Sequence, residues 1–368
     1  MAITNKIKFA RQEKTTESTT GGTDWVVQGT LLDKGHMSAG SDYVMVSWVN
    51  CISSGTNEGG TKLAFEAGGG DIVGSAHERR DTNSSGMAVP FIGQFTAPSP
   101  TEDVGIYRRR MFGSNGEGTE YAQAFIIDLS YSGVSGGLVS GTDFSSTRSL
   151  TETVTAPNNL MLEHTVANSS GTQLVLATSR VYDSNDEVLL GLYINDVLVT
   201  SGSRYTQDSS DIKSVVFAGA YNMDEDDTVK IKNIDPQYAT SDYKYIFTLN
   251  IDDAPATQAT GQLSTWTNHG GSGSWGTATI NGNNDTSFVI GMGRQTVVGA
   301  ESGRMASTSL KNNTSDEWLL FKDRPSGEYS PLYFPATNPG VDGGQYETSV
   351  IVGVGQIGTS DEIEMRTL

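Results

Sequence analysis

The chain has 368 residues, a formal net charge of −19 at pH 7 and a single cysteine, Cys51. The length is enough for two or three domains with cores of their own, whereas the strong negative charge argues against a nucleic-acid-binding surface. The chain has no stretch of 18 apolar residues, no signal-peptide core near its start and no second cysteine, so we expect no membrane span, no secretory export and no intrachain disulfide.

Short apolar runs separated by polar turns fill the chain from end to end. Its 43 glycines far outnumber its 10 prolines, and helical i, i+3, i+4 stripes are hard to find. The longest apolar run, residues 188–194, is followed by Asn195-Asp196, a pair that favours a hairpin turn. Many short strands with polar turns indicate an all-β fold of the sandwich or barrel type.

Each third of the chain opens with a β-rich segment and continues, after a polar loop, into a second strand. The opening segments are Ile7-Lys8-Phe9-Ala10, Phe125-Ile126-Ile127-Asp128-Leu129 and Ile246-Phe247-Thr248-Leu249-Asn250-Ile251. The second strands are residues 42–48, 159–164 and 285–290.

A strand with a central glycine and then a strand led by an acidic residue close each third. The glycine strands are Phe91-Ile92-Gly93-Gln94-Phe95, Phe217-Ala218-Gly219-Ala220-Tyr221 and Ile351-Val352-Gly353-Val354-Gly355. The acid-led strands begin at Glu102, Asp227 and Asp361, which lie 9, 8 and 8 positions after the glycines. A fixed order of elements at a period of about 120 residues indicates a repeated unit.

We therefore predict three tandem β-sandwich domains, at residues 1–123, 124–244 and 245–368, with the longest loop insertion in the third. The final strand of each unit runs close to the opening strand of the next, so the boundaries can shift along the chain.

Charge is distributed unevenly between these units. Residues 1–123 carry 11 Lys and Arg against 14 Asp and Glu (net −3), and residues 124–368 carry 13 against 29 (net −16). The first unit also contains Arg108, Arg109 and Arg110. One interpretation is a solvated strand end. The other makes these three arginines the anchoring contacts of the first unit with an acidic partner.

The histidines and the serine motif do not indicate catalysis. His36, His77, His164 and His269 lack metal-ligand spacing, and only His164 lies in a predicted strand, where we expect a structural role. Gly133-Val134-Ser135-Gly136-Gly137 matches the nucleophile-elbow pattern, but the residues that follow do not start the helix which that motif needs. We predict no catalytic residue and no enzymatic activity.

Two acidic segments carry enough oxygen ligands to raise the question of calcium. They are Asp224-Glu225-Asp226-Asp227 and Asp183-Ser184-Asn185-Asp186-Glu187. Neither has the glycine and distal glutamate of a helix-loop-helix calcium site. We predict ordinary acidic turns, no metal and no cofactor, with calcium as the alternative.

Aromatic residues in the third unit are candidate ligand contacts. Trp266 and Trp275 flank a glycine-rich loop, and Tyr329 and Tyr333 lie in or just after a stretch punctuated by prolines. Inserted loops often carry function, so these rings could contact a glycan or a protein. The alternative is that they cover the ends of a sandwich core.

The glycine strand, the turn and the acid-led strand resemble the closing strands of jelly-roll domains of the C1q/tumour-necrosis-factor type. The aromatic signature residues of that family are missing, so the resemblance implies a jelly-roll-like architecture and no more. The acidic, Cys-poor composition, rich in Gly, Ser, Thr and Asn, resembles that of virion proteins of tailed bacteriophages, especially head-decoration, head-fibre and tail-fibre proteins. This second resemblance implies assembly in the host cytoplasm, a place in the virion, other virion proteins as partners, and a homo-oligomer, often a trimer.

Two functions remain. The first is a non-enzymatic phage virion structural protein, a capsid decoration, head-fibre or other particle-surface component. The alternative is a tail-fibre adhesin or carbohydrate-binding protein that recognises a host-surface glycan. A β-sandwich hydrolase or lyase would need a carboxylate or histidine constellation that the sequence does not contain. Whether the three units pack as a pseudo-trimer or as a linear array is left open.

Overall fold

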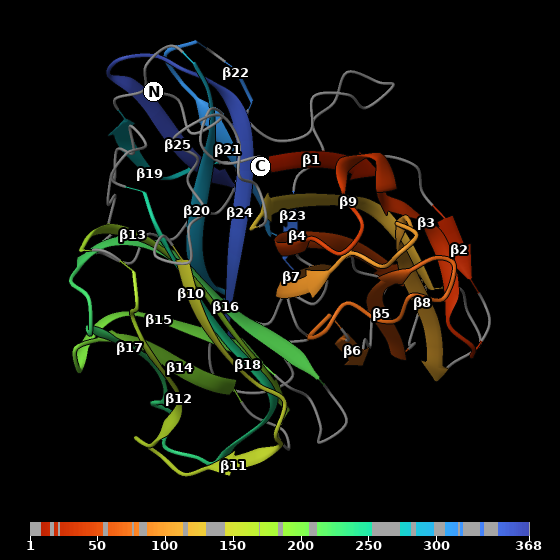
Figure 1. The fold of residues 1–368 in the computed structure, drawn as a ribbon, viewed down its shortest axis with the longest axis horizontal. Coiled ribbons are helices and arrows are strands. Elements are labelled where there is room, and N and C mark those ends of the chain that lie inside the picture. The colour runs from red at the N-terminus through yellow and green to blue at the C-terminus, as the bar shows by residue number, and fades with distance from the viewer. Residues whose placement is uncertain are drawn as a thin grey trace.

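The computed structural model describes the backbone of most of the chain, namely residues 9–14, 18–20, 23–53, 58–75, 77–80, 87–112, 117–129, 144–168, 170–182, 187–205, 212–251, 273–280, 285–297, 306–315, 317–318, 332–334 and 345–367. Side chains are described within residues 23–49, 59–75, 89–110, 122, 124–129, 144–168, 170–182, 188–202, 212–251, 312–315 and 357–364. All sheets are antiparallel, which confirms the predicted all-β sandwich fold (Figure 1).

The first sandwich consists of two sheets in jelly-roll order. Its strands are β1 (Phe9–Lys14), β2 (Ser18–Thr20), β3 (Val26–Leu32), β4 (Asp42–Ser53), β5 (Glu58–Phe65), β6 (His77–Arg80), β7 (Met87–Thr96), β8 (Val104–Phe112) and β9 (Glu117–Asp128), with a short 3-10 turn, η2 (Lys34–His36). One sheet has the order β1-β9-β4-β7, with β2 also on β9, and the other has the order β3-β8-β5-β6. The chain therefore crosses from one sheet to the other between most successive strands, as in a jelly roll, and stays in one sheet from β1 to β2 and from β5 to β6.

The second sandwich repeats this order. Its strands are β10 (Phe144–Ser149), β11 (Thr153–Thr155), β12 (Leu160–Thr165), β13 (Gly171–Tyr182), β14 (Glu187–Ile194), β15 (Val197–Tyr205), β16 (Lys213–Met223), β17 (Thr228–Asn233) and β18 (Ala239–Asn250). The sheets are β10-β18-β13-β16, with β11 also on β18, and β12-β17-β14-β15. Each strand of the second sandwich has a counterpart at the same place in the first.

The third group of strands follows the same plan as far as it is described. Its strands are β19 (Gly273–Ile280), β20 (Asp285–Val297), β21 (Ala306–Asn312), β22 (Glu317–Trp318), β23 (Leu332–Phe334), β24 (Gln345–Ile357) and β25 (Asp361–Thr367). They form the sheet β19-β25-β21-β22, with β23 also on β21, and the pair β20-β24.

Strand pairing places the unit boundaries later than the sequence suggests. The expected boundary at 123/124 lies inside β9, which pairs with β1 and β4. The boundary at 244/245 lies inside β18, which pairs with β10 and β13. Residues 125–129 and 246–251 therefore close the first and second sandwiches and do not open the next ones. The division into three units stays a prediction, now with boundaries after β9 and after β18.

Each of the first two sandwiches encloses an apolar core between its two sheets. In the first, alternate β4 residues such as Tyr43 and Met45 point into this core, where they meet Leu63 and Ile106 from the opposite sheet. In the second, the corresponding core contains the side chains of Val175, Phe217, Leu192 and Ile231, among others. The two-residue alternation of strands separates these side chains from their neighbours on the other face.

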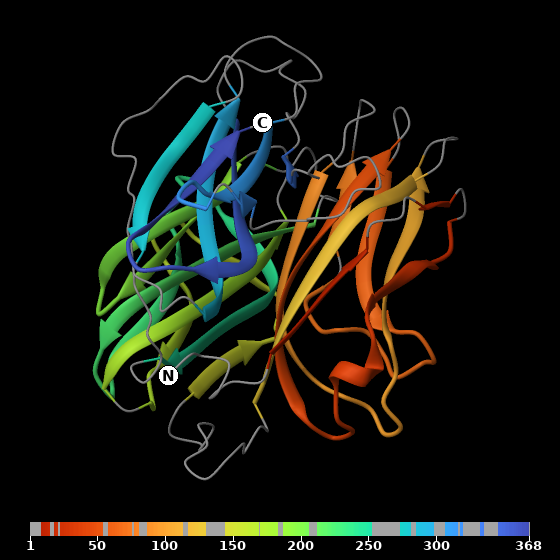
Figure 2. The same ribbon diagram turned by 90° about the horizontal axis from the view of Figure 1, so that it is seen from above.

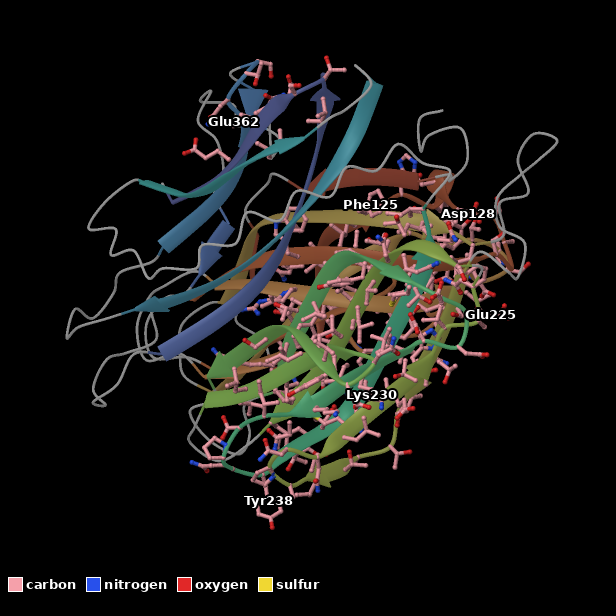
Figure 3. All side chains as sticks on the ribbon, turned by 90° about the vertical axis from the view of Figure 1, so that its left-hand side faces the viewer. Phe125, Asp128, Glu225, Lys230, Tyr238 and Glu362 are labelled. Atoms are coloured by element: carbon pink, nitrogen blue, oxygen red, sulfur yellow. The ribbon has the colours of Figure 1, made fainter. Side chains whose placement is uncertain are left out.

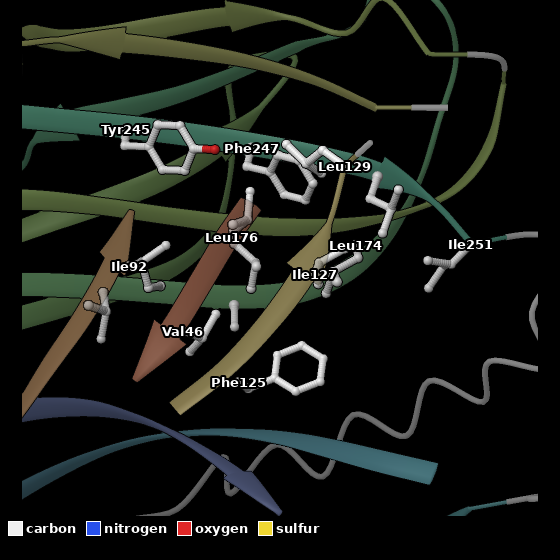
Figure 4. Packing of buried hydrophobic residues seen from close by; sticks show 14 of the residues in the cluster. Val46, Ile92, Phe125, Ile127, Leu129, Leu174, Leu176, Tyr245, Phe247 and Ile251 are labelled. Atoms are coloured by element: carbon white, nitrogen blue, oxygen red, sulfur yellow. The ribbon is translucent and has the colours of Figure 1, made fainter. Parts of the chain in front are cut away.

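The other faces of the two central sheets pack against each other (Figure 3). Buried side chains there come from all three groups of strands: Val44, Val46, Trp48, Ile92, Phe125, Ile127 and Leu129 from the first, Leu174, Leu176, Val216, Ala218, Tyr243, Tyr245, Phe247, Leu249 and Ile251 from the second, and Ile357 and Ile363 from the third. We call this cluster the shared core. Figure 4 shows side chains of the first two sandwiches pointing toward one another within it. The sandwiches are thus grouped around a common centre and not strung out in a line (Figure 2).

Glycines at the centre of β7 and of its counterpart β16 fit this crowded arrangement. Gly93 pairs with Met45 and Gly219 pairs with Val175, so they occupy the same place in the two sandwiches. A Cβ atom on Gly93 would lie 2.8 Å from the carbonyl oxygen of Val73, and one on Gly219 would lie 2.6 Å from the hydroxyl of Tyr221. The repeated glycine is therefore explained by close packing of neighbouring groups.

Candidate functional site

The acidic residue of the repeated motif holds two turns together in the second sandwich. One carboxylate oxygen of Asp227 accepts a hydrogen bond from the backbone N–H of Asp224 (2.8 Å), and the other accepts from Nδ2 of Asn195 (2.7 Å). Asn195 lies in the turn between β14 and β15, and its Oδ1 accepts from the backbone N–H of Thr228 (2.9 Å). The carboxylate therefore joins the turn before β17 to the turn after β14.

The same device recurs in the other two units. Asp361 accepts hydrogen bonds from the backbone N–H of Gly358 and from Nδ2 of Asn312, each at 2.7 Å. The carboxylate of Glu102 accepts from two backbone N–H groups in the turn after β5, each at 3.0 Å. The acidic residue of the motif that reveals the repeat in the sequence thus acts as a structural clamp between turns.

This clamp bears on the calcium alternative. Both oxygens of Asp227 accept hydrogen bonds from the protein, and the described part of the chain contains no group of three His, Cys, Asp or Glu side chains arranged to hold a metal ion. Residues 183–186 of the other acidic segment lie outside the described residues. Calcium at either segment stays a prediction of the sequence alone.

The arginine triplet is divided between the two faces of β8. Arg108 points inward, is 3% exposed and bonds to the hydroxyl of Thr61. Arg109 points outward, with its guanidinium carbon 4.6 Å from the centre of the Trp25 ring, and Arg110 is partly buried. The expectation of three adjacent anchoring contacts is wrong for Arg108, because a residue buried in the sandwich cannot meet a partner. For Arg109 and Arg110 it stays a prediction.

Arg109 belongs to a cluster on the outer face of the first sandwich that sequence reasoning missed. The Lys62 amine lies 5.0 Å from the centre of the Trp25 ring and 5.8 Å from that of Tyr107, and it forms a 2.7 Å ion pair with Asp71, which is 58% exposed. Burial, together with nearby carboxylates, raises the pKa of Tyr107. We call Trp25, Lys62, Asp71, Tyr107 and Arg109 the Trp25 surface. It combines aromatic rings, cations and an exposed carboxylate.

The backbone makes room for this surface. Trp25 reaches over Gly60 of β5, where a Cβ atom would lie 2.8 Å from the ring carbon Cη2 of Trp25. Gly60 pairs with Arg109, and Lys62 pairs with Tyr107. The cluster is therefore assembled by the register of β5 on β8, so its members are far apart in sequence.

His164 lies in a buried cluster of hydroxyl groups in the second sandwich. Its Nε2 is 3.0 Å from Oγ of Ser145 and 3.2 Å from Oγ1 of Thr248, and its Nδ1 is 3.0 Å from Oγ1 of Thr147. The side chain is 3% exposed, and burial lowers the pKa of His164 to about 4. The ring is therefore neutral at pH 7. Its arrangement is the hydrogen-bonded structural role that the sequence predicts.

The Ser145–His164 distance is that of a nucleophile–base pair. The group facing Nδ1, however, is the hydroxyl of Thr147 and not the carboxylate that orients such a base. The cluster instead ties β10 and β18 of one sheet to β12 of the other. The nucleophile-elbow string at residues 133–137 lies outside the described residues.

The aromatic residues predicted as ligand contacts are described only in part. Trp266 and Tyr329 lie outside the described residues. Trp275 is in β19 and Tyr333 is in β23, where it pairs with Ser307 of β21, but their side chains are not described. Contact of these four residues with a ligand stays a prediction.

Comparison with known proteins gives no family. No family model and no curated protein matches the chain. Solved structures to which the chain is similar include the CBM22-1–CBM22-2 tandem domain of Xyn10C from Paenibacillus barcinonensis (9% identity over 67% of this chain and 98% of that chain, TM-score 0.21), Sulfolobus Turreted Icosahedral Virus (7% over 88% and 78%, TM-score 0.21) and dimeric latent PorU from Porphyromonas gingivalis (8% over 87% and 32%, TM-score 0.20). TM-scores this low support no functional inference.

None of the helical segments in the described part of the chain has the length and hydropathy to cross a membrane.

Proposed function

We propose that this protein is a non-enzymatic structural component of a phage virion, a capsid decoration, head-fibre or other particle-surface protein with other virion proteins as partners. The observation that carries the proposal is the shared core, which joins jelly-roll sandwiches into one body. A structural protein on a particle surface needs a stable folded body, which the shared core supplies. A net charge of −19 keeps densely displayed copies soluble and apart.

The outer face of the first sandwich is the proposed attachment surface. It carries Arg109 on Trp25 within the least acidic part of the chain. Deleting the first sandwich would not test this proposal, because deletion would also expose Tyr245 and Phe247 of the shared core. A single substitution on the outer face avoids that problem.

The test is incorporation into particles. Tagged chain is produced during particle assembly, the particles are purified on a density gradient, and the tag is quantified. We expect a fixed copy number for the native chain and loss of incorporation for Arg109→Glu. Lys232→Glu is the matched control, since Lys232 stacks on Tyr193 (4.5 Å) on the corresponding face of the second sandwich. Native chain absent from the particles would contradict the proposal.

The Trp25 surface favours the alternative, a carbohydrate-binding protein or tail-fibre adhesin. Lys62 and Arg109 lie over the Trp25 ring, and the exposed carboxylate of Asp71 pairs with Lys62. An aromatic ring with charged groups close by is a combination that can contact the apolar face of a sugar and bond to its hydroxyls. On a glycan array, this function predicts retention that Trp25→Ala abolishes and that Val26→Ala, a neighbouring exposed position, leaves intact. Loss with Trp275→Ala instead would move the site to the third unit.

A further inference from the structure

If the sandwiches were separate chains, they could associate through the apolar sheet faces that lie in the shared core. In this protein those faces are already buried within one chain. On the first sandwich, Trp48 and Phe125 are each 1% exposed, and on the second, Tyr245 and Phe247 are fully buried. Sheets of an isolated sandwich would present these rings to water. Removing these large apolar side chains from water stabilises the packed state.

Polar groups at this contact are matched across the two sandwiches. The hydroxyl of Tyr243 donates to the backbone carbonyl of Ile92 (3.4 Å). Oε1 of Gln94 accepts from the hydroxyls of Tyr245 (3.3 Å) and Ser146 (3.2 Å). A buried tyrosine hydroxyl needs a partner, and Tyr243 and Tyr245 each have one on the first sandwich.

Shape is matched as closely as polarity. The ring of Tyr243 lies so near Gly74 of the first sandwich that a Cβ there would be 2.3 Å from a ring carbon, and its hydroxyl would be 3.4 Å from a Cβ on Gly93. Only glycine at position 74 leaves space for this ring. Such complementarity is typical of a permanent interface.

The third group of strands completes the arrangement. Ile357 at the end of β24 and Ile363 in β25 are 1% and 5% exposed and lie in the shared core. Strand β24 contacts β15 and β16 of the second sandwich and β7 of the first. Three groups of strands in one chain therefore meet at one centre.

The outer faces of the sandwiches differ. Tyr107 and Lys232 hold equivalent places, because each follows an apolar residue that pairs with the equivalent strand: Ile106 pairs with β5, and Ile231 pairs with β14. In the first sandwich this face carries the Trp25 surface. In the second, Lys232 stacks on Tyr193 and bonds to Asp196 (2.8 Å). Three identical chains would instead present three identical outer faces.

We infer that the protein is a monomer in solution, a single-chain equivalent of the trimer predicted from the sequence, and that a partner meets each of its outer faces once per molecule. The monomeric state does not depend on the proposed function, but its consequence on a particle does: one chain, not three, fills one attachment site, and the Trp25 surface occurs there once.

Mass in solution tests the inference without any particle or ligand. Size-exclusion chromatography with light scattering, over a hundredfold range of concentration, should give the chain mass of 39.2 kDa throughout. A species of two or three chain masses at any of these concentrations would overturn the inference.

A matched pair of variants tests the shared core itself. Phe247→Lys places a charge in the shared core, whereas Val26→Lys places it at a position that is 40% exposed. We expect Phe247→Lys to lose the cooperative thermal transition or lower its midpoint strongly, and Val26→Lys to leave the midpoint unchanged. A Phe247→Lys chain with native midpoint and native hydrodynamic radius would show that the sandwiches do not depend on one another.

Discussion

Acid should weaken this protein through His164. The pKa of His164 in the folded protein is about 4, below the ordinary value of about 6.5 for an unfolded chain. As pH falls below 6.5, the unfolded chain takes up a proton that the buried ring cannot, so stability is lost until pH reaches about 4. The difference of about 2.5 pKa units corresponds to about 3 kcal/mol at most, of which about 2.5 kcal/mol is lost between pH 7 and pH 4.5.

The assay is urea unfolding at pH 7 and at pH 4.5, compared between native chain and His164→Gln. Glutamine keeps a donor and an acceptor for Ser145 and Thr147 but does not titrate. We expect the native chain to lose about 2.5 kcal/mol more than this variant over the interval. His36→Gln, at an exposed position, should behave like the native chain. Equal losses in native chain and His164→Gln would refute the reasoning.

Three further predictions concern packing and the clamp. Phe247→Ala should cost about 3–5 kcal/mol in urea unfolding, because the ring is fully buried in the shared core; a loss below about 1 kcal/mol would mean that the core is loosely packed. Asp361→Ala should lower the free energy of unfolding by about 1–3 kcal/mol, because the amide of Asn312 loses its 2.7 Å acceptor. An unchanged unfolding midpoint would show that this clamp does not stabilise the fold. Gly93→Ala should cost about 1–3 kcal/mol, because its Cβ would lie 2.8 Å from the oxygen of Val73; a native thermal midpoint would show that the strands can move apart there.

The all-β fold and the repeated motifs could be predicted because their signals are local. Alternation and turn residues give the strands, and the acidic residue at the head of the closing strand is visible at Asp227 and Asp361. What it bonds to is not visible, because Asn195 and Asn312 lie 32 and 49 residues away. The two-residue alternation of a strand places Arg108 and Arg109 on opposite faces. The sequence alone therefore argues against the prediction that both contact the same partner.

The order of elements along the chain does not reveal that β9 belongs to the first sandwich and β18 to the second. Phe125 pairs with Val46, and Phe247 pairs with Leu176, and pairing over such separations is fixed by the assembled sheet. One signal for the shared core was present. Residues 125–127 and 245–247 are short runs of consecutive apolar residues, which are typical of strands buried on both faces. The Trp25 surface carried no comparable signal, because its residues are far apart in sequence and come together around the pairing of β5 with β8.

Cryo-electron microscopy of the native particle tests the central claim most directly. We expect ordered density for three sandwiches around one centre, with one chain at each attachment site. The outer face of the first sandwich should lie against the particle. A well-resolved particle surface that contains no such density, together with retention of the free chain on a glycan array, would contradict the structural role and favour the carbohydrate-binding one.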